Sequence, residues 1–139
     1  MKIQNIVKYS AISVVMITGL IAVLFFNYPV SHNATFKNDE IITLFIYQSG
    51  VIKNKIEFPP NSKEHAILNN WLSSNSAGWS HDINSYTPSF YISSKGISIN
   101  LKNGFSVINY AQYSKDRHTQ IIKNMDNSRI IKELIEIDI

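Results

Sequence analysis

One uninterrupted apolar block dominates the hydrophobic pattern of this chain. Residues 9–31 carry no charged side chain, and residues 11–26 are almost entirely apolar. About 20 apolar residues in a helix cross the roughly 30 Å hydrocarbon layer of a bilayer. The block therefore predicts a transmembrane helix over residues 9–30, in contact with lipid, after a short N-terminal tail of residues 1–8.

Two interpretations of this block are open, a retained anchor and a cleaved signal peptide. Signal peptidase cleavage requires small residues at the −3 and −1 positions. The block ends in the bulky run Leu24–Tyr28, and Ser31 with Asn33 is the nearest approach to a small pair. We therefore favour a retained signal anchor.

The charges around the block predict its orientation. Lys2 and Lys8 precede it, and the first lysine after it is Lys37. Positive charge is retained on the cytoplasmic side of a membrane. We expect a single-pass protein of the bacterial inner membrane, with a cytoplasmic N-terminus and the rest of the chain in the periplasm or outside the cell.

After a polar linker at residues 31–38, residues 39–139 read as one small domain with mostly strand-like patterns. Apolar and polar residues alternate in several short runs, and the turn signals Gln48-Ser49-Gly50 and Asn103-Gly104 separate neighbouring runs. About five antiparallel strands are predicted. The runs are residues 41–47, 51–58, 90–92, 97–101 and 105–110, with 118–124 as a further candidate.

Two segments have helical periodicity. Asn61 and Glu64 form a capping-box pattern in front of an apolar stripe, which predicts a helix over residues 62–74. A second stripe at residues 130–135, with Asp126 or Ser128 as its cap, predicts a C-terminal helix. The fold class is therefore α+β, with the first helix packed on one face of the sheet.

Composition narrows the functional classes. Of 13 basic and 10 acidic residues, Lys2 and Lys8 belong to the N-terminal tail, so the exported part has a charge of only +1. The lysines are scattered rather than clustered with aromatics, and no nucleic-acid partner is expected. The chain has no cysteine, which is unusual for a small eukaryotic secreted module and favours a bacterial envelope protein.

The search for chemistry is negative. Phosphate-binding, nucleophile-elbow and zincin motifs are absent from the sequence, and the four histidines have no ligand-like spacing. Ser80-His81-Asp82 resembles a triad only in composition, because adjacent residues of an extended chain point to opposite sides. We expect no catalytic residues, no metal site and no cofactor.

Aromatic residues in loops are the remaining candidates. Trp79 follows Gly78 in a predicted loop, where no periodicity requires burial. Such a side chain either pins its loop to the core or belongs to a recognition surface. The first interpretation is favoured. The second would form a partner-binding patch from Trp79, His81, Tyr86, Tyr110 and Tyr113.

The order of motifs over residues 61–120 resembles small uncharacterised single-span bacterial membrane proteins. It runs from the helix to Ala77-Gly78-Trp79, Thr87-Pro88, the run 96–100 and the run 107–110. The resemblance covers about half of the exported domain and implies no activity. The architecture, a short cytoplasmic end, one span and one exported domain, also resembles membrane-anchored immunity proteins that protect bacteria from periplasm-acting bacteriocins.

Three functions are compatible with these observations. The first, which we favour, is a membrane-tethered protein-binding module in the periplasm, such as an immunity or inhibitor protein. The second is an accessory subunit of an envelope complex, in which the span itself makes contacts. The third is a small envelope enzyme, for which His81 and Asp82 are the best candidates.

Overall fold

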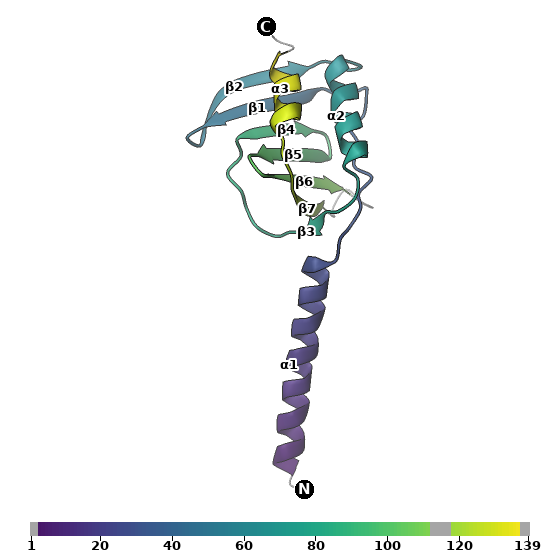
Figure 1. Cartoon of the computed structure of the whole chain (residues 1–139), viewed down its shortest axis with the longest axis vertical. Coiled ribbons are helices and arrows are strands. Elements are labelled where there is room, and N and C mark those ends of the chain that lie inside the picture. Colours follow the sequence, from purple (N-terminus) through teal and green to yellow (C-terminus); the bar gives the residue numbers. More distant parts are fainter. Residues whose placement is uncertain (1–2, 112–117, 137–139) are drawn as a thin grey trace.

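The apolar block forms a long isolated helix, α1 (Ile3–Asn27), in a computed structural model that describes residues 3–111 and 118–136. The helix projects from the folded part of the molecule as a rod (Figure 1). Its segment Val7–Asn27 has a mean hydropathy of 2.3, and none of it is buried within the molecule. Twenty-five residues rise about 38 Å. Helix α1 is therefore long and apolar enough to cross a membrane.

The rest of the described chain is built on one antiparallel sheet of seven strands in the order β2-β1-β4-β5-β6-β7-β3. The strands are β1 (Ile42–Gln48), β2 (Val51–Phe58), β3 (Ser80–His81), β4 (Phe90–Ser94), β5 (Ile97–Lys102), β6 (Phe105–Ala111) and β7 (His118–Asn124). The predicted α+β class is confirmed. The predicted number of about five strands is too low, because residues 118–124 form a full strand and because β3 is too short to leave a hydrophobic pattern.

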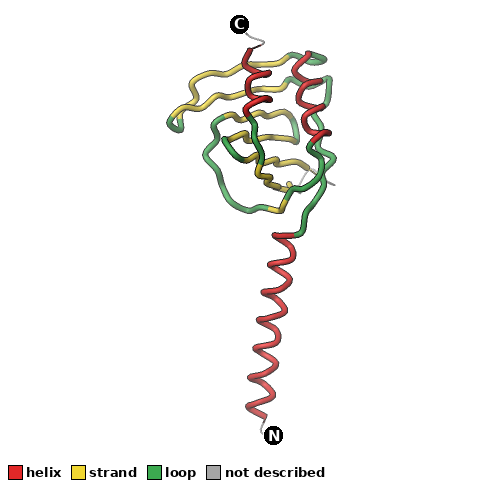
Figure 2. The backbone as a smooth tube through the Cα atoms, viewed as in Figure 1, coloured by secondary structure: helices red, strands yellow, loops and turns green. Residues whose placement is uncertain are grey.

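Helices α2 (Lys63–Ser74) and α3 (Ser128–Ile135) cover one face of this sheet (Figure 2). The register aligns one residue from each of five strands across that face, and each of these side chains is at most 1% exposed. The row is Leu44, Ile92, Ile99, Ile108 and Ile121. Burying such a side chain stabilises the fold by about 1.5–3 kcal/mol. Leu68, Leu72 and Leu134 of the helices close the core from above.

Residues 82–89, here called the strap, cross the face opposite the helices. The strap runs from β3 at one edge of the sheet back to β4 near the middle (Figure 1). Gln120 on β7 donates from its Nε2 to Asp82 Oδ2 and to the backbone carbonyl of Asn84, each at 2.7 Å. The strap is therefore tied to the sheet by hydrogen bonds rather than by a continuous apolar stripe.

Residues 31–38, predicted as a polar linker, pack against the domain. The Phe36 side chain is 2% exposed and belongs to the core. Asn69 of α2 binds the Phe36 backbone at both ends: its Oδ1 accepts from the amide at 2.8 Å, and its Nδ2 donates to the carbonyl at 2.9 Å. The Asn69 side chain thus satisfies the backbone groups of Phe36 as a neighbouring strand would. The folded domain therefore extends back to the end of α1.

The predicted cap of α2 is wrong by one residue. Ser62 is the N-cap, and Asn61 lies before it with a left-handed backbone at φ 60°. The Ser62 hydroxyl contacts His65 Nδ1 at 3.0 Å, while His65 Nε2 donates to the Glu40 carbonyl at 2.7 Å. Because Nε2 must carry the proton for that bond, Nδ1 accepts from the serine. The buried histidine thus takes the place that the predicted capping box gave to Glu64.

The C-terminal helix also begins differently from the prediction, which named Asp126 or Ser128 as its cap. Asn127 is the N-cap, and its side chain bonds away from the helix: Nδ2 donates to the carbonyls of Lys102 and Phe105, and Oδ1 accepts from Ser106, all at 2.8 Å. One buried amide therefore joins α3 to the β5–β6 hairpin.

The strands stack along the direction in which α1 projects (Figure 1). Strand β3 contacts α1, and β2 is the strand at the opposite edge of the sheet. One edge of the sheet therefore lies beside the apolar helix, and the other lies at the far end of the domain.

Candidate functional site

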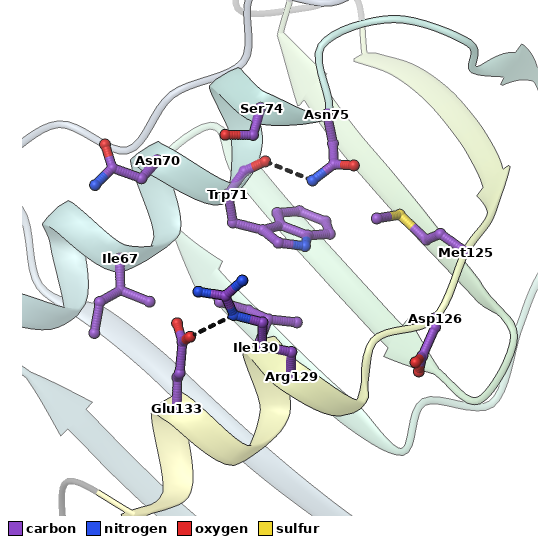
Figure 3. A pocket seen from close by; sticks show the side chains of 10 residues that line it. All are labelled: Ile67, Asn70, Trp71, Ser74, Asn75, Met125, Asp126, Arg129, Ile130 and Glu133. Carbon is purple, nitrogen blue, oxygen red and sulfur yellow. Dashed lines mark hydrogen bonds and ion pairs between the residues drawn. The ribbon is translucent and has the colours of Figure 1, made fainter.

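A groove with a volume of about 430 Å³ lies between α2 and α3 (Figure 3). One wall is formed by α2 and its C-cap, with the residues Ile67, Asn70, Trp71, Ser74 and Asn75. The facing wall is formed by α3 and the segment before it, with the residues Met125, Asp126, Arg129, Ile130 and Glu133. Both helices rest on the sheet, so the groove has a rigid base. It lies on the helix-covered face of the domain.

The floor of the groove is apolar. The Trp71 ring points into the space between the helices, and Met125 lies opposite it (Figure 3). Trp71 is half-buried and its ring meets the fully buried Trp79 edge-on, with 6.5 Å between centroids. Ile67 and Ile130 complete the floor. The groove therefore exposes part of a large aromatic side chain that is fixed from below by the core.

Charged groups form the rim. Arg129 Nε donates to Glu133 Oε1 at 2.9 Å, one helical turn along α3. The pKa of the Asp126 carboxyl is lowered because the Ser128 backbone amide and hydroxyl both donate to it. Asp126 is thus anionic at neutral pH, and the rim presents both signs of charge.

The composition of the groove resembles that of protein interfaces. Tryptophan, methionine and arginine are enriched in the centres of protein interfaces, where a polar rim surrounds an apolar core. Within the described residues that line the groove, no hydroxyl is hydrogen-bonded to a histidine or carboxylate that could activate it. In the ranges 3–111 and 118–136, no group of three or more His, Cys, Asp or Glu residues is placed to hold a metal ion.

Two of the sequence-predicted recognition residues are buried. Trp79 is 0% exposed and Tyr110 is 5% exposed. Both rings surround the imidazole of His32, at centroid distances of 5.3 and 6.2 Å. Neither is accessible to a partner from outside. The burial of Trp79 matches the other interpretation of loop aromatics, which pin their loop to the core.

The other predicted recognition residues are separated from each other. His81 on β3 stacks on Phe25 of α1, with 4.4 Å between centroids and 5° between planes. Tyr86 on the strap lies against Phe105, with 5.1 Å between the ring centroids. Both rings are on the face of the sheet that the strap covers. Tyr113 lies outside the described residues. These aromatics therefore do not form one surface patch in the described part of the structure.

The His32 cluster instead joins α1 to the domain. Val30 and Trp79 exchange two backbone hydrogen bonds, at 2.7 and 3.1 Å, and the His32 amide donates to the Ser76 carbonyl at 2.8 Å. Burial lowers the pKa of His32; the Asn75 carbonyl opposes this effect, and the charge of Lys123 adds to it. The imidazole is consequently neutral at pH 7, as its apolar surroundings require.

The groove was missed because it depends on how two helices meet. In α2, the apolar residues Ile67, Leu68, Trp71 and Leu72 form a stripe two residues wide. Leu68 and Leu72 face the sheet, while Ile67 and Trp71 face α3. The width of this stripe was the signal in the sequence. An apolar stripe that is too wide for a single packing contact indicates that the helix has a second neighbour.

No protein-family model, no curated protein and no solved structure matches this chain. The resemblance to small single-span membrane proteins therefore stays a prediction.

Proposed function

We propose that this protein is a membrane-tethered, extracytoplasmic binding module of the bacterial envelope that engages a protein partner through the groove between α2 and α3. An immunity or inhibitor protein that occludes a periplasm-acting toxin is the form of this function that we favour. The observation that carries the proposal is the partly exposed Trp71, which packs on the core at the floor of a groove with a charged rim.

The arrangement of α1 supports the tether. Its side chains are exposed along the whole apolar segment, so the domain offers them no apolar partner. The Phe25–His81 stack and the Val30–Trp79 bridge would be lost if the first thirty residues were cleaved, which favours a retained anchor. The positive-inside rule favours a cytoplasmic N-terminus, because Lys2 and Lys8 precede the span.

Topology can be tested directly because the chain has no cysteine. Single Asn5→Cys and Asn124→Cys variants, which keep Lys2 and Lys8, are exposed in intact spheroplasts to a membrane-impermeant maleimide. We expect labelling at residue 124 and none at residue 5. Immunoblotting of the same samples should give the full mass of 15.8 kDa. The reverse labelling, or a product shortened by about 30 residues, would refute the anchor.

Partner binding is tested by photocrosslinking in living cells. A photoreactive residue replaces Asn70 on the groove rim, and the matched control replaces the exposed Asn124 on the sheet. We expect a discrete protein adduct only from position 70, and its loss when Trp71→Ala is added. Equal adducts from both positions, or an adduct that survives Trp71→Ala, would argue against the groove.

The alternative, an accessory subunit held by its span, is separated by replacing residues 9–27 with an unrelated apolar helix. A tether tolerates this exchange, because only its length and apolarity are used. Loss of the position-70 adduct after the exchange would favour the accessory subunit, since it would assign the contact to the surface of α1.

A further inference from the structure

A second hollow lies on the other face of the sheet, beneath the strap, with a volume of about 220 Å³. The polar part of its lining consists mainly of amides: Asn84 from the strap, Asn100 from β5, Asn109 from β6 and Gln120 from β7. We call this hollow the amide pocket. It is separated from the α2–α3 groove by the full thickness of the sheet.

The amide of Asn100 is the feature that the fold does not explain. Its side chain is 7% exposed, yet its Oδ1 makes no hydrogen bond with any described group. A buried acceptor without a partner is costly, and buried polar atoms nearly always have one. The register places Asn100 between Tyr91 and Val107 on the strap-covered face, where it lines the pocket. Because Asn100 lines the pocket, a ligand held there is the candidate for the missing partner.

The lining defines the chemistry of that partner. The described residues that line the pocket carry no acid, lysine, arginine or histidine, and the Asp82 carboxylate behind them is already bonded to Asn84 and Gln120, so no lining charge would compensate a phosphate, a carboxylate or an ammonium group. The amide oxygens can accept, and the amides of Asn100 and Asn109 also carry N–H donors, which matches hydroxyl groups that donate and accept. Tyr86 and Tyr91 add aromatic faces, and Val107 adds an apolar floor. A neutral, hydroxyl-rich ring fits this combination.

We propose that the amide pocket binds a neutral sugar residue, with Asn100 Oδ1 accepting from one ring hydroxyl and a tyrosine face packing against the ring. Drug-sized ligands occupy pockets of roughly 300–1,000 Å³, so the pocket accommodates a smaller ligand such as one sugar ring of a longer glycan. This site is independent of the protein-binding groove, because the two lie on opposite faces of the sheet.

The strap gives the pocket a fixed wall. Asp82 accepts from Asn84 Nδ2 at 2.7 Å and from Gln120 Nε2 at 2.7 Å, and it is 8% exposed. These bonds occupy the donors of the two amides and leave their oxygens to accept. The pocket is therefore formed before the ligand arrives, which reduces the entropy lost on binding.

The test uses the full chain in lipid nanodiscs, since maltoside or glucoside detergents would themselves supply the sugar. Glucose, galactose, mannose and N-acetylglucosamine are titrated to 100 mM, and binding is followed by NMR shifts of the side-chain amides. We expect at least one sugar to bind with a dissociation constant on the order of millimolar, as small neutral ligands do. The shifts should be confined to the strap and strands β4–β7.

Asn100→Leu is the decisive variant. It removes the unpartnered oxygen while nearly keeping the volume, so we expect sugar binding to be lost and the melting temperature to rise by several degrees. Asn124→Ala, on the exposed end of β7, is the control and should change neither. If Asn100 only supported the fold, its replacement would lower the melting temperature.

Three results would overturn the proposal. The first is the absence of shifts with all four sugars at 100 mM, which would mean that the pocket holds ordered water alone. The second is sugar binding that survives Asn100→Leu. The third is stronger shifts with a charged probe, inorganic phosphate or acetate, than with any neutral sugar. None of these results bears on the Asn70 crosslink, so this proposal can fail while the protein-binding function stands.

Discussion

The two faces of the sheet are closed in opposite ways. On one face, α2 and α3 lie on an aliphatic row that is at most 1% exposed. On the other, an eight-residue strap crosses above tyrosines and amides and is held by the hydrogen bonds of Asp82 and Gln120. Aliphatic packing is worth several kcal/mol per side chain, whereas each hydrogen bond contributes about 1 kcal/mol. Stability therefore resides on the helix face, and the strap face is left with room for recognition.

Two buried asparagines make the same contrast at the level of single residues. Asn127 is 1% exposed and its amide has three bonds, to Ser106, Lys102 and Phe105. Asn100 is nearly as buried but its oxygen has none among the described groups. The first asparagine joins two elements on the helix face. The second faces a hollow on the strap face.

The largest effect is expected from Ile99→Ala, at the centre of the helix face. Ile99 is 0% exposed, so truncation should cost about 2–5 kcal/mol of unfolding free energy. Denaturant unfolding followed by tryptophan fluorescence measures it, because both tryptophans lie in the domain. The control Val51→Ala is 68% exposed and should stay within about 0.5 kcal/mol of wild type. Equal losses would contradict the assignment of the core.

Next in size is Asn127→Ala, which removes three hydrogen bonds and leaves the Ser106 hydroxyl without its acceptor. The expected loss is about 1–3 kcal/mol in the same assay. Asn103→Ala in the exposed β5–β6 turn is the comparison, because it alters the same hairpin without touching this network. If Asn127→Ala were neutral, the joint between α3 and the hairpin would have no energetic role.

Gln120→Ala should act locally. It breaks the two side-chain bonds between Gln120 and the strap, leaves the backbone bond from the Asp82 amide to the Gln120 carbonyl, and should cost about 1 kcal/mol globally. Hydrogen exchange of the strap amides should accelerate, while the amides of β4–β6 stay protected because their ladder is unchanged. Uniform acceleration across the sheet would mean that the strap is part of the global folding unit.

The smallest effect depends on pH and concerns His32. Its folded pKa lies below the unfolded value near 6.5, so the unfolded chain binds the proton first. Stability is therefore complete above pH 6.5 and falls as the pH drops through the interval between the unfolded and folded pKa values. His32→Gln should reduce the dependence of the unfolding free energy on pH in this acidic interval. Between pH 7 and 8 the substitution should leave that dependence unchanged. An unchanged acid slope in unfolding experiments would refute the assignment.

Local signals in the sequence predicted much of this fold. The α1 block, the hairpin at Asn103-Gly104 and the α2 stripe depend on residues close together in the chain, and each corresponds to an observed element. Strand β3 was not predicted, because two residues have no periodicity. Its position depends on pairing with β7, about 40 residues later, and on the contact of Trp79 with Val30.

The candidate sites were less predictable, since both are made by long-range contacts. Trp71 belongs to the same apolar stripe as Leu68, and only the position of α3 distinguishes their surroundings. Asn100 alternates with apolar residues as an exposed strand residue does, and the strap that covers it lies elsewhere in the sequence. The alternation of apolar and polar residues indicates on which face of a strand a residue lies. It does not indicate which segment of the chain covers that face.

The open edge at β2 has a consequence for association. Eight residues of this strand lie mostly exposed at the end of the sheet opposite α1, and edge strands invite intermolecular pairing. Two copies joined through β2 would place their α1 helices at opposite ends of a doubled sheet (Figure 1). With both helices inserted in one bilayer in the same direction, that union is geometrically forbidden. Anchoring would thereby prevent this pairing through β2, and a soluble fragment without α1 would lose that protection.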